Sequence, residues 1–123
     1  MVEKNFIINE SNTAKTMGSG GLEVLASPAL VTFMENLAFT TLEKECQEHQ
    51  TSVGVSFNLD HLKPSLVGET VTILITSKSS DGKCVTFNLE AYCNEVLIAK
   101  AIHKRVIITK EKFLRRLFNS DKK

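Results

Sequence analysis

The residue best placed to do chemistry in this chain is Glu35, which interrupts a long apolar run. It is the one charged residue between Glu23 and Glu43, in the segment VLASPALVTFMENLAFTTL. A helix that is apolar on nearly every side is typical of a protein core. A carboxylate buried there without a partner is costly, so it is usually neutralised, paired or used. We therefore expect Glu35 to be a functional residue.

His61 is the second candidate, because it ends a strand-like segment. The residues from 51 to 61 alternate, and one face is formed by Val53, Val55, Phe57, Leu59 and His61. This parity predicts that His61 faces the same side as the apolar residues, at the edge of the core and beside a loop. A titratable group there suits acid–base catalysis. A histidine held by backbone hydrogen bonds is the structural alternative.

Ser27 is the third candidate and lies at the expected start of the helix. Serine is a good N-cap, and Pro28 then takes the first helical position, where its missing N–H costs nothing. The hydroxyl would lie where backbone N–H groups and the helix dipole favour anions. Ser27 and Glu35 are eight residues apart, about 12 Å along a helix. A shared site therefore needs a substrate that spans both, or groups from two subunits.

The other histidines carry weaker signals. His103 has the parity of the apolar residues Ala99 and Ala101, which favours a sheet histidine with structural hydrogen bonds. His49 lies in the polar turn QEHQTS, where we expect it to be solvated.

The elements that must position these residues follow in a simple order. One helix from Ser27 to between Gln47 and His49 precedes a series of strands, which is an α+β arrangement. The other expected elements are an edge strand (Phe6–Asn9), a flexible connection (Ser11–Gly21), strands (Thr51–His61, Thr70–Ser79, Cys84–Cys93 and Val96–Thr109), turns (Asp81-Gly82 and Asn94-Glu95) and a terminal helix (Lys110–Phe118). The helix and the last strand are apolar on more than one side. This excess predicts a partner subunit, a two-fold copy of the chain.

Composition excludes several classes of protein. The 123 residues suffice for one domain, and a formal net charge of +1 does not favour nucleic acid or an anionic membrane as partner. The three cysteines form no C-x-x-C motif and none lies near a histidine, so no metal site is expected. Free thiols are typical of the cytoplasm, and the N-terminus has no apolar signal core. The proline, asparagine and glutamate of the apolar segment favour a core helix over a membrane span.

Three runs of the chain resemble the fluoroacetyl-CoA thioesterase-like branch of the hotdog-fold superfamily. They are VLASPALVTFMENLA, TSVGVSFNLDHLKPSLVGETV and AIHKRVIITKEKF, within Val24 to Phe113. The resemblance implies a hotdog fold, in which an antiparallel β-sheet wraps one long central helix. It also implies a homodimer, able to assemble further, with acyl-CoA sites at the subunit interface. Residues 1–123 then form one domain, with a flexible N-terminal segment (1–21) and a short C-terminal helix and tail (110–123).

The resemblance also implies roles for single residues. Ser27 falls on the catalytic threonine of the family, Glu35 on its catalytic glutamate and His61 on its catalytic histidine. The family hydrolyses acyl-CoA thioesters, and coenzyme A enters as part of the substrate, so no separate cofactor is expected. Whether Glu35 is the nucleophile or the general base for water stays open. The expected substrate-binding residues are His103, Arg105 and Gly68, the first two with a structural role as the alternative.

Two departures from the family pattern bear on the substrate. Serine replaces threonine at position 27, and the N-terminal region lacks the aromatic-containing lid segment of the fluoroacetyl-specific enzyme. We therefore expect a different or broader range of small acyl groups. A non-catalytic acyl-CoA-binding hotdog protein is the main alternative from another class, and a hotdog dehydratase is a further enzymatic one.

Overall fold

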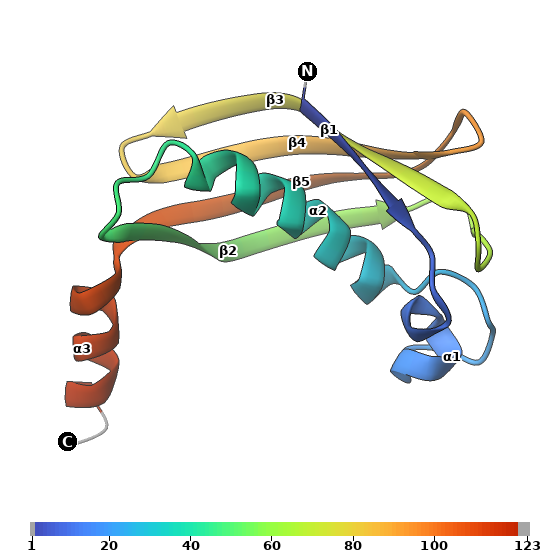
Figure 1. Ribbon diagram of the computed structural model, residues 1–123, viewed down its shortest axis with the longest axis horizontal. Helices are drawn as coiled ribbons and strands as arrows, with labels where there is room; N and C mark the ends of the chain where they lie inside the picture. Colours follow the sequence, from blue (N-terminus) through green and yellow to red (C-terminus); the bar gives the residue numbers. More distant parts are fainter. Residues whose placement is uncertain (1, 121–123) are drawn as a thin grey trace.

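The computed structural model describes residues 2–120 as a five-stranded antiparallel sheet curved around one long helix (Figure 1). The sheet order is β1-β3-β4-β5-β2, so β1 and β2 form its two edges. The elements are β1 (Val2–Ile7), the 3-10 turn η1 (Glu10–Asn12), α1 (Ala14–Met17), α2 (Ser27–Glu43), β2 (Gln50–His61), β3 (Thr70–Asp81), β4 (Cys84–Cys93), β5 (Val96–Thr109) and α3 (Lys110–Ser120). The expected architecture, an antiparallel sheet around one long helix, is confirmed.

The turns between the strands follow from local sequence. Asn94 and Glu95, between β4 and β5, have φ angles of 51° and 64°. Two successive positive φ values match a two-residue hairpin turn, which suits the twist of antiparallel strands. Gly82, after β3, has φ of 65°, which costs a glycine little. Both predicted hairpins are therefore present.

Helix α2 lies across one face of the sheet and supplies much of the core. Its buried residues are Ala29, Leu30, Phe33, Met34, Leu37, Ala38 and Leu42. The ring of Phe33 stacks on Phe6 of β1, with centroids 4.6 Å apart. The helix ends at Glu43, a few residues before the expected end, because the polar residues after it form turns rather than a further helical turn.

The N-terminal segment is folded, which corrects the expectation of a flexible segment over 1–21. β1 pairs with β3, and the chain then forms η1 and α1. The N–H groups of Ala14 and Lys15 donate to the carbonyls of Val24 and Leu22, over 2.8 and 3.0 Å. The small polar residues cap and turn the backbone here; the hydroxyl of Thr13, for example, accepts from the N–H of Thr16. Met1 lies outside the described residues.

Strand β2 contains an irregularity that the alternating sequence conceals. Gly54 pairs with Arg105 of β5. Ser56 pairs with Lys104, which directly precedes Arg105 in the chain. Val55 therefore has no partner of its own on β5. An extra residue of this kind shifts the alternation by one position. Before it the even-numbered side chains face the helix, and after it the odd-numbered ones do.

The extra residue corrects the expectation that all odd positions of this strand face the helix. Val53 and Val55 lie on the opposite face, and Val55 is largely exposed. His61 keeps the helix-facing orientation that its parity predicts. Before the irregularity, Ser52 and Gly54 take the helix-facing positions.

The two ends of the fold extend beyond β2 in the same direction. Figure 1 shows β2 at the lower edge of the sheet, with α3 descending at one end and α1 lying below the edge at the other. Within residues 2–120 no strand pairs with the outer edge of β2. None of the described helices is long and apolar enough to cross a membrane.

Candidate active site

Ser27 and His61 are in contact at the N-terminal end of α2. The Ser27 Oγ and His61 Nδ1 atoms are 2.8 Å apart, a hydrogen-bond distance. Ser27 is the first residue of α2, and Ala26 is the N-cap without a side-chain hydrogen bond. The predicted N-cap role of Ser27 is therefore wrong. Its hydroxyl binds a histidine from β2 instead of an N–H group of its own helix.

His61 retains one ring nitrogen without a partner. Its Nε2 atom is buried and makes no hydrogen bond to any residue of the described chain. Burial lowers the pKa of His61 below its usual 6.5, while the backbone of Lys63 acts in the opposite direction. The ring is therefore neutral at pH 7. Its Nε2 then donates or accepts according to the tautomer, and a shallow pocket that includes Leu62 and Pro64 adjoins it.

Glu35 lies near the middle of α2 and is not sealed in the core. Its side chain is 42% exposed, and its Oε2 atom is 3.8 Å from the Nη1 atom of Arg105 on β5. The guanidinium carbon of Arg105 also lies 5.6 Å from the ring centre of Phe39, one helical turn beyond Glu35. Partial exposure and a cationic neighbour together account for a carboxylate on an otherwise apolar helix.

Arg105 is held in place by three hydrogen bonds and is almost fully buried. Its Nε atom donates to the Ser52 hydroxyl over 2.9 Å, and its Nη2 atom donates to the Ser52 carbonyl over 3.1 Å. Its Nη1 atom donates to Nε2 of His103 over 3.1 Å. Burial lowers the pKa of Arg105, and the carboxylates of Glu35 and Glu43 oppose this effect.

His103 has both ring nitrogens occupied and is 1% exposed. Its Nδ1–H donates to the carbonyl of Ser56 over 2.9 Å, which leaves Nε2 to accept from Arg105. Burial lowers the pKa of His103, Arg105 adds to the effect, and the Ser56 carbonyl and Glu35 act against it. The geometry favours the structural alternative for His103 and Arg105, since neither presents a group to solvent. Their substrate-binding role stays a prediction.

Sequence reasoning gave no role to Ser52 and Gly54, although both shape the surroundings of Glu35. A Cβ atom on Gly54 would lie 3.0 Å from Glu35 Oε2 and 3.1 Å from His103 Cε1. Even an alanine at this position would require Glu35 and His103 to move by a few tenths of an ångström. A glycine inside a β-branched strand often marks such a close approach, so the signal was available in the sequence.

The candidate residues form two separate groups within one chain. Ser27 and Glu35 are eight residues apart on α2, about 12 Å along the axis. On β2, Gly54 lies beside Glu35 and seven residues before His61, about 20 Å of strand. Glu35 and His61 therefore do not contact each other within one subunit.

Gly68 lies in the turn before β3. Its φ angle is 92°, and its N–H donates to the Ile8 carbonyl over 2.9 Å. A glycine suits this left-handed position for conformational reasons alone. The predicted contact with substrate stays a prediction.

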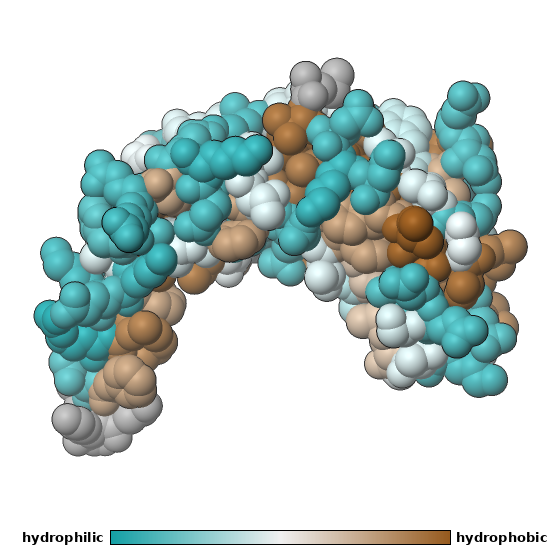
Figure 2. Space-filling model, viewed as in Figure 1, coloured by the Kyte–Doolittle hydropathy of each residue, from teal (hydrophilic) through white to brown (hydrophobic). Residues whose placement is uncertain are grey.

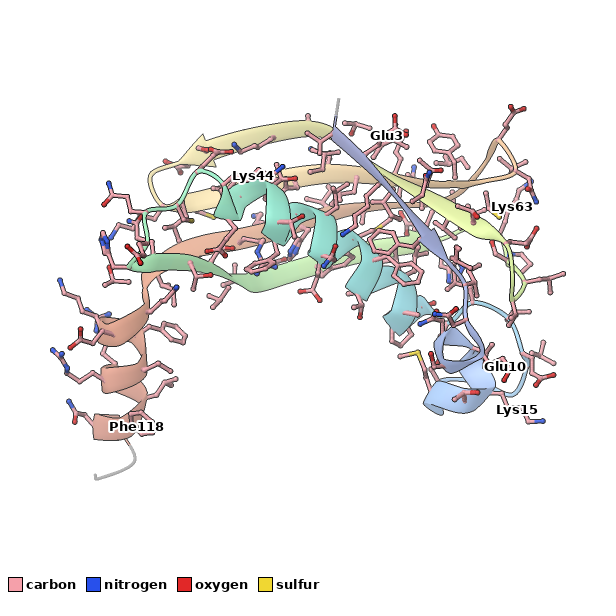
Figure 3. All side chains as sticks on the ribbon, viewed as in Figure 1. Glu3, Glu10, Lys15, Lys44, Lys63 and Phe118 are labelled. Atoms are coloured by element: carbon pink, nitrogen blue, oxygen red, sulfur yellow. The ribbon has the colours of Figure 1, made fainter. Side chains whose placement is uncertain are left out.

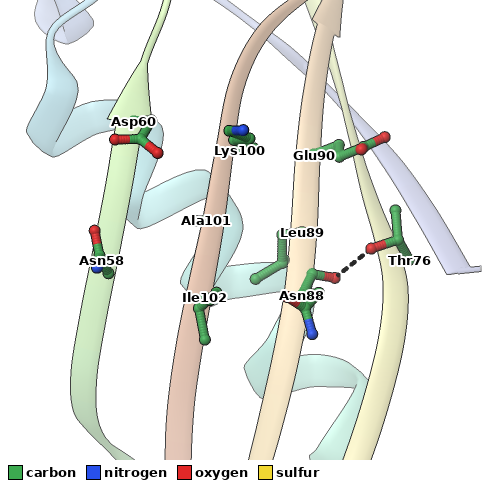
Figure 4. Close-up of a pocket in the computed structure, with 9 residues that line it drawn as sticks. All are labelled: Asn58, Asp60, Thr76, Asn88, Leu89, Glu90, Lys100, Ala101 and Ile102. Carbon is green, nitrogen blue, oxygen red and sulfur yellow. Dashed lines mark hydrogen bonds between the residues drawn. The ribbon is translucent and has the colours of Figure 1, made fainter.

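A depression on the outer face of the sheet contains none of the candidate residues. Figure 4 shows that it lies across β2, β5, β4 and β3, on the side of the sheet away from α2. Its lining is mainly polar and includes Asn58, Asp60, Asn88, Glu90 and Lys100. Among the described residues, no group of three or more histidine, cysteine or acidic side chains could hold a metal ion.

Solved structures with the same fold include enzymes and proteins without a stated activity. A mutant of the fluoroacetyl-CoA-specific thioesterase FlK, in complex with fluoroacetate and CoA, is 20% identical to this chain, with a TM-score of 0.90 and 98% of each chain covered. A hot-dog-like protein from Thermanaerovibrio acidaminovorans is 22% identical, with a TM-score of 0.88, 97% of this chain covered and 88% of that one. A hypothetical protein from Thermus thermophilus, a thioesterase superfamily member, is 24% identical, with a TM-score of 0.85, 98% of this chain covered and 88% of the other.

Identities of 20–24% to these solved structures show that the fold is shared and nothing more. The family assignment therefore rests on comparison of the sequence itself with family models. No curated protein matches the chain. The family model described as fluoroacetyl-CoA-specific thioesterase matches residues 8–111, a range that includes every candidate residue named above. The chain therefore belongs to the fluoroacetyl-CoA-specific thioesterase family, within the hotdog-fold thioester hydrolases.

Proposed function

We propose that this protein hydrolyses small acyl-CoA thioesters to the free acid and CoA, at a site shared by two copies of the chain. The observation that carries the proposal is the Ser27–His61 hydrogen bond, which leaves Nε2 of His61 without a partner. A buried nitrogen without a partner costs about 1–3 kcal/mol, and a bound substrate would remove that cost. Membership of a thioesterase family supports the reaction class.

The division of the candidate residues into two groups supports a shared site. The outer edge of β2 offers unpaired backbone groups over 12 residues, and such an edge readily pairs with another chain. Two-fold pairing of β2 with its copy would bring a second α2 to this edge. Glu35 of one subunit would then approach the Ser27–His61 pair of the other, which a single chain keeps too far away.

Two chemical routes use the same residues. In the first, Glu35 removes a proton from water, the water oxygen attacks the acyl carbon, and the carbon–sulfur bond breaks. In the second, an oxygen of Glu35 attacks the acyl carbon, and water then hydrolyses the mixed anhydride. In both, the CoA thiolate leaves and takes up a proton that comes from the consumed water, and Glu35 carries this proton in the first route. Neutral His61 would polarise the thioester by a hydrogen bond from its Nε2–H, without itself losing a proton. The Ser27 hydroxyl would donate to Nδ1 of His61 and so keep the ring proton on Nε2, while the free N–H groups at the start of α2 would stabilise the negative carbonyl oxygen.

The substrate class follows from the family and from this chain's differences. Structurally similar proteins include a fluoroacetyl-CoA-specific thioesterase and a gentisyl-coenzyme A thioesterase. Ser27 in place of threonine, and a segment over 11–21 without an aromatic residue, favour small acyl groups other than fluoroacetyl. The proposal needs no resident cofactor. It places the enzyme in the cytoplasm, in keeping with three unpaired thiols.

The first test is release of free CoA from a panel of short and aromatic acyl-CoAs. Turnover that depends on Glu35 supports the proposal. The competing reading is a protein that binds acyl-CoA without turnover. Tight binding with an intact thioester after long incubation would establish that reading and overturn ours.

The second test asks whether the site is shared. Glu35→Gln and His61→Ala are each expected to be inactive, and an equal mixture should recover about a quarter of wild-type activity. Half of the dimers are then mixed, and each holds one intact site. A mixture that stays inactive after the subunits have exchanged would place all three residues in one subunit's site and contradict the shared arrangement.

A further inference from the structure

Helix α3 carries an apolar face that its own chain leaves uncovered. Leu114 and Leu117 are each 51% exposed and Phe118 is 65% exposed, with Phe113 beside them. Their spacing places them on one side of the helix. Figure 2 shows this brown strip along α3 on the inner side of the arch, and Figure 3 shows Phe118 at the far end of the helix. An amphipathic helix with its apolar side in water calls for a partner surface.

Helix α3 begins beside the first residues of β2, whose outer edge is unpaired in the described chain. Thr109, the last residue of β5, pairs with Gln50, the first residue of β2. The N–H of Lys110 donates to the carbonyl of His49 over 3.0 Å. From there α3 descends past the β2 edge, into the space that a copy paired along that edge would occupy (Figure 1).

A second uncovered apolar area lies at the opposite end of β2. This corner patch consists of Leu22, Leu62, Leu66 and Val67, of which Leu22 and Leu66 are the most exposed. A bridge between Val24 and Leu66 holds its two segments together. Figure 2 shows a second brown area at this end of the arch, above α1. Leu62 of this patch directly follows His61.

Symmetry connects the two surfaces. When two copies of β2 pair antiparallel around a two-fold axis, the first residues of one strand lie beside the last residues of the other. The helix α3 of each copy therefore arrives at the corner patch of its partner. We propose that the apolar face of α3 docks on the corner patch of the second copy, so that the dimer exchanges two helical arms. This inference rests on the dimer of the proposed function and adds a contact to it.

The charges around the two surfaces are complementary. Helix α3 carries four cations, at positions 110, 112, 115 and 116, and one carboxylate, Glu111. A shallow pocket beside Leu66 and Val67 is lined by Glu10 and Glu23. Lys63 borders the patch on its other side, near Leu62. Attraction between a basic helix and two carboxylates favours the docked orientation and raises the association rate.

The contact has a consequence for the site. Leu62 and His61 line the same shallow pocket, so a helix docked on the corner patch borders the Ser27–His61 pair of the partner. The arm would thereby form one wall of the approach to the partner's site.

The experiment measures dimer dissociation by sedimentation. Leu117→Glu and Leu66→Glu should each raise the dissociation constant of the dimer at least about tenfold, which corresponds to about 1.4 kcal/mol. Asn119→Glu is the matched control, since it adds the same charge on the opposite side of α3 and should leave the constant unchanged. Circular dichroism checks that each variant is folded. A dimer that both leucine variants leave intact would overturn the inference.

A mixing experiment tests that the contact joins two subunits. Leu117→Lys and Leu66→Glu should each dimerise weakly alone, and should form mixed dimers when combined. In the mixed dimer the new lysine meets the new glutamate, and the other arm keeps its native apolar contact. Weak homodimers without preferred mixed dimers would contradict the assignment of the corner patch as the docking site of α3.

The outcome is independent of the enzymatic proposal. If the wild-type protein releases no CoA but Leu117→Glu still weakens the dimer, the arm contact stands and the proposed reaction fails. If CoA is released and the leucine variants keep both the dimer and the wild-type activity, the reaction stands and the arm contact fails.

Discussion

The two strand histidines, His61 and His103, have similar sequence surroundings and opposite environments. Each follows the parity of apolar neighbours and each has a pKa lowered by burial. His103 lies in mid-strand with both nitrogens bonded, whereas His61 ends its strand with Nε2 unbonded. The difference indicates that a histidine with all its hydrogen bonds satisfied supports the fold, while one with a spare bond is available to a ligand.

The same contrast holds for the serines that accompany them. Ser52 holds Arg105 with both its hydroxyl and its carbonyl, in a cluster where each nitrogen of Arg105 has a hydrogen-bond partner. Ser27 contacts His61 at the end of α2, where the helix has free N–H groups. Glu35 lies between the two environments, since its carboxylate is near Arg105 and also reaches solvent.

The largest effect is expected for Glu35, whose carboxylate is near the buried Arg105 and is also open to solvent. Glu35→Gln should lower kcat/KM about 10³-fold, because an amide can neither attack the acyl carbon nor take a proton from water. The melting temperature should change little, because the side chain is partly exposed and its ion pair is long. Glu43→Gln, two turns further along α2, is the control and should keep wild-type turnover. Full activity in Glu35→Gln would remove this residue from the mechanism.

The two histidines should separate activity from stability. His61→Ala should lower kcat/KM about 10²-fold or more with little change in unfolding free energy. His103→Ala should cost about 2–4 kcal/mol of stability, because it opens a cavity and leaves Arg105 and the Ser56 carbonyl without their partner. Turnover rates and denaturant unfolding of the two variants decide the matter. If the two variants show the same loss of stability, the contrast between the histidines is wrong.

Much of this contrast could be predicted from the sequence, because it depends on local periodicity. The strand bounds of 84–93 and 96–109, the hairpin turns and the helix-facing position of His61 all follow from alternation and turn residues. The irregularity at Val55 could not be predicted in this way, because an unbroken apolar alternation continues through it. The bond from Ser27 to His61 joins residues 34 positions apart, and a good N-cap residue gave no sign of it.

The N-terminal region shows a second limit of sequence reasoning. Its small polar residues are common both in flexible connections and in tightly capped turns. Which of the two forms depends on partners elsewhere in the chain, here the carbonyls of Leu22 and Val24 and the strand β3. Composition alone does not contain that information.

The pH dependence of stability should reveal the two lowered histidine pKa values. A histidine with a folded pKa below its unfolded value of 6.5 binds fewer protons when folded, so stability is fully present above pH 6.5 and is lost as pH falls through the folded pKa. The wild-type protein should therefore lose stability as the pH falls below 6.5 more steeply than His103→Gln. Urea unfolding at several pH values measures this. Parallel curves for the two proteins would mean that His103 is not held neutral by the fold.

The smallest effects are expected from the two serines. As with the histidines, one substitution should lower activity and the other should lower stability. Ser27→Ala should lower kcat/KM about tenfold, since His61 loses the hydroxyl that orients its ring, and should hardly change stability, because Ser27 is not the N-cap. Ser52→Ala should leave kcat/KM nearly unchanged and cost about 1–2 kcal/mol of stability, since the buried Arg105 Nε loses its acceptor. Ser27→Thr should retain activity, because it keeps the hydroxyl. If Ser52→Ala instead reduced turnover as much as Ser27→Ala, the Arg105 cluster would contribute to the chemistry through its hold on Glu35, and the division into a supporting and a reacting region would have to be abandoned.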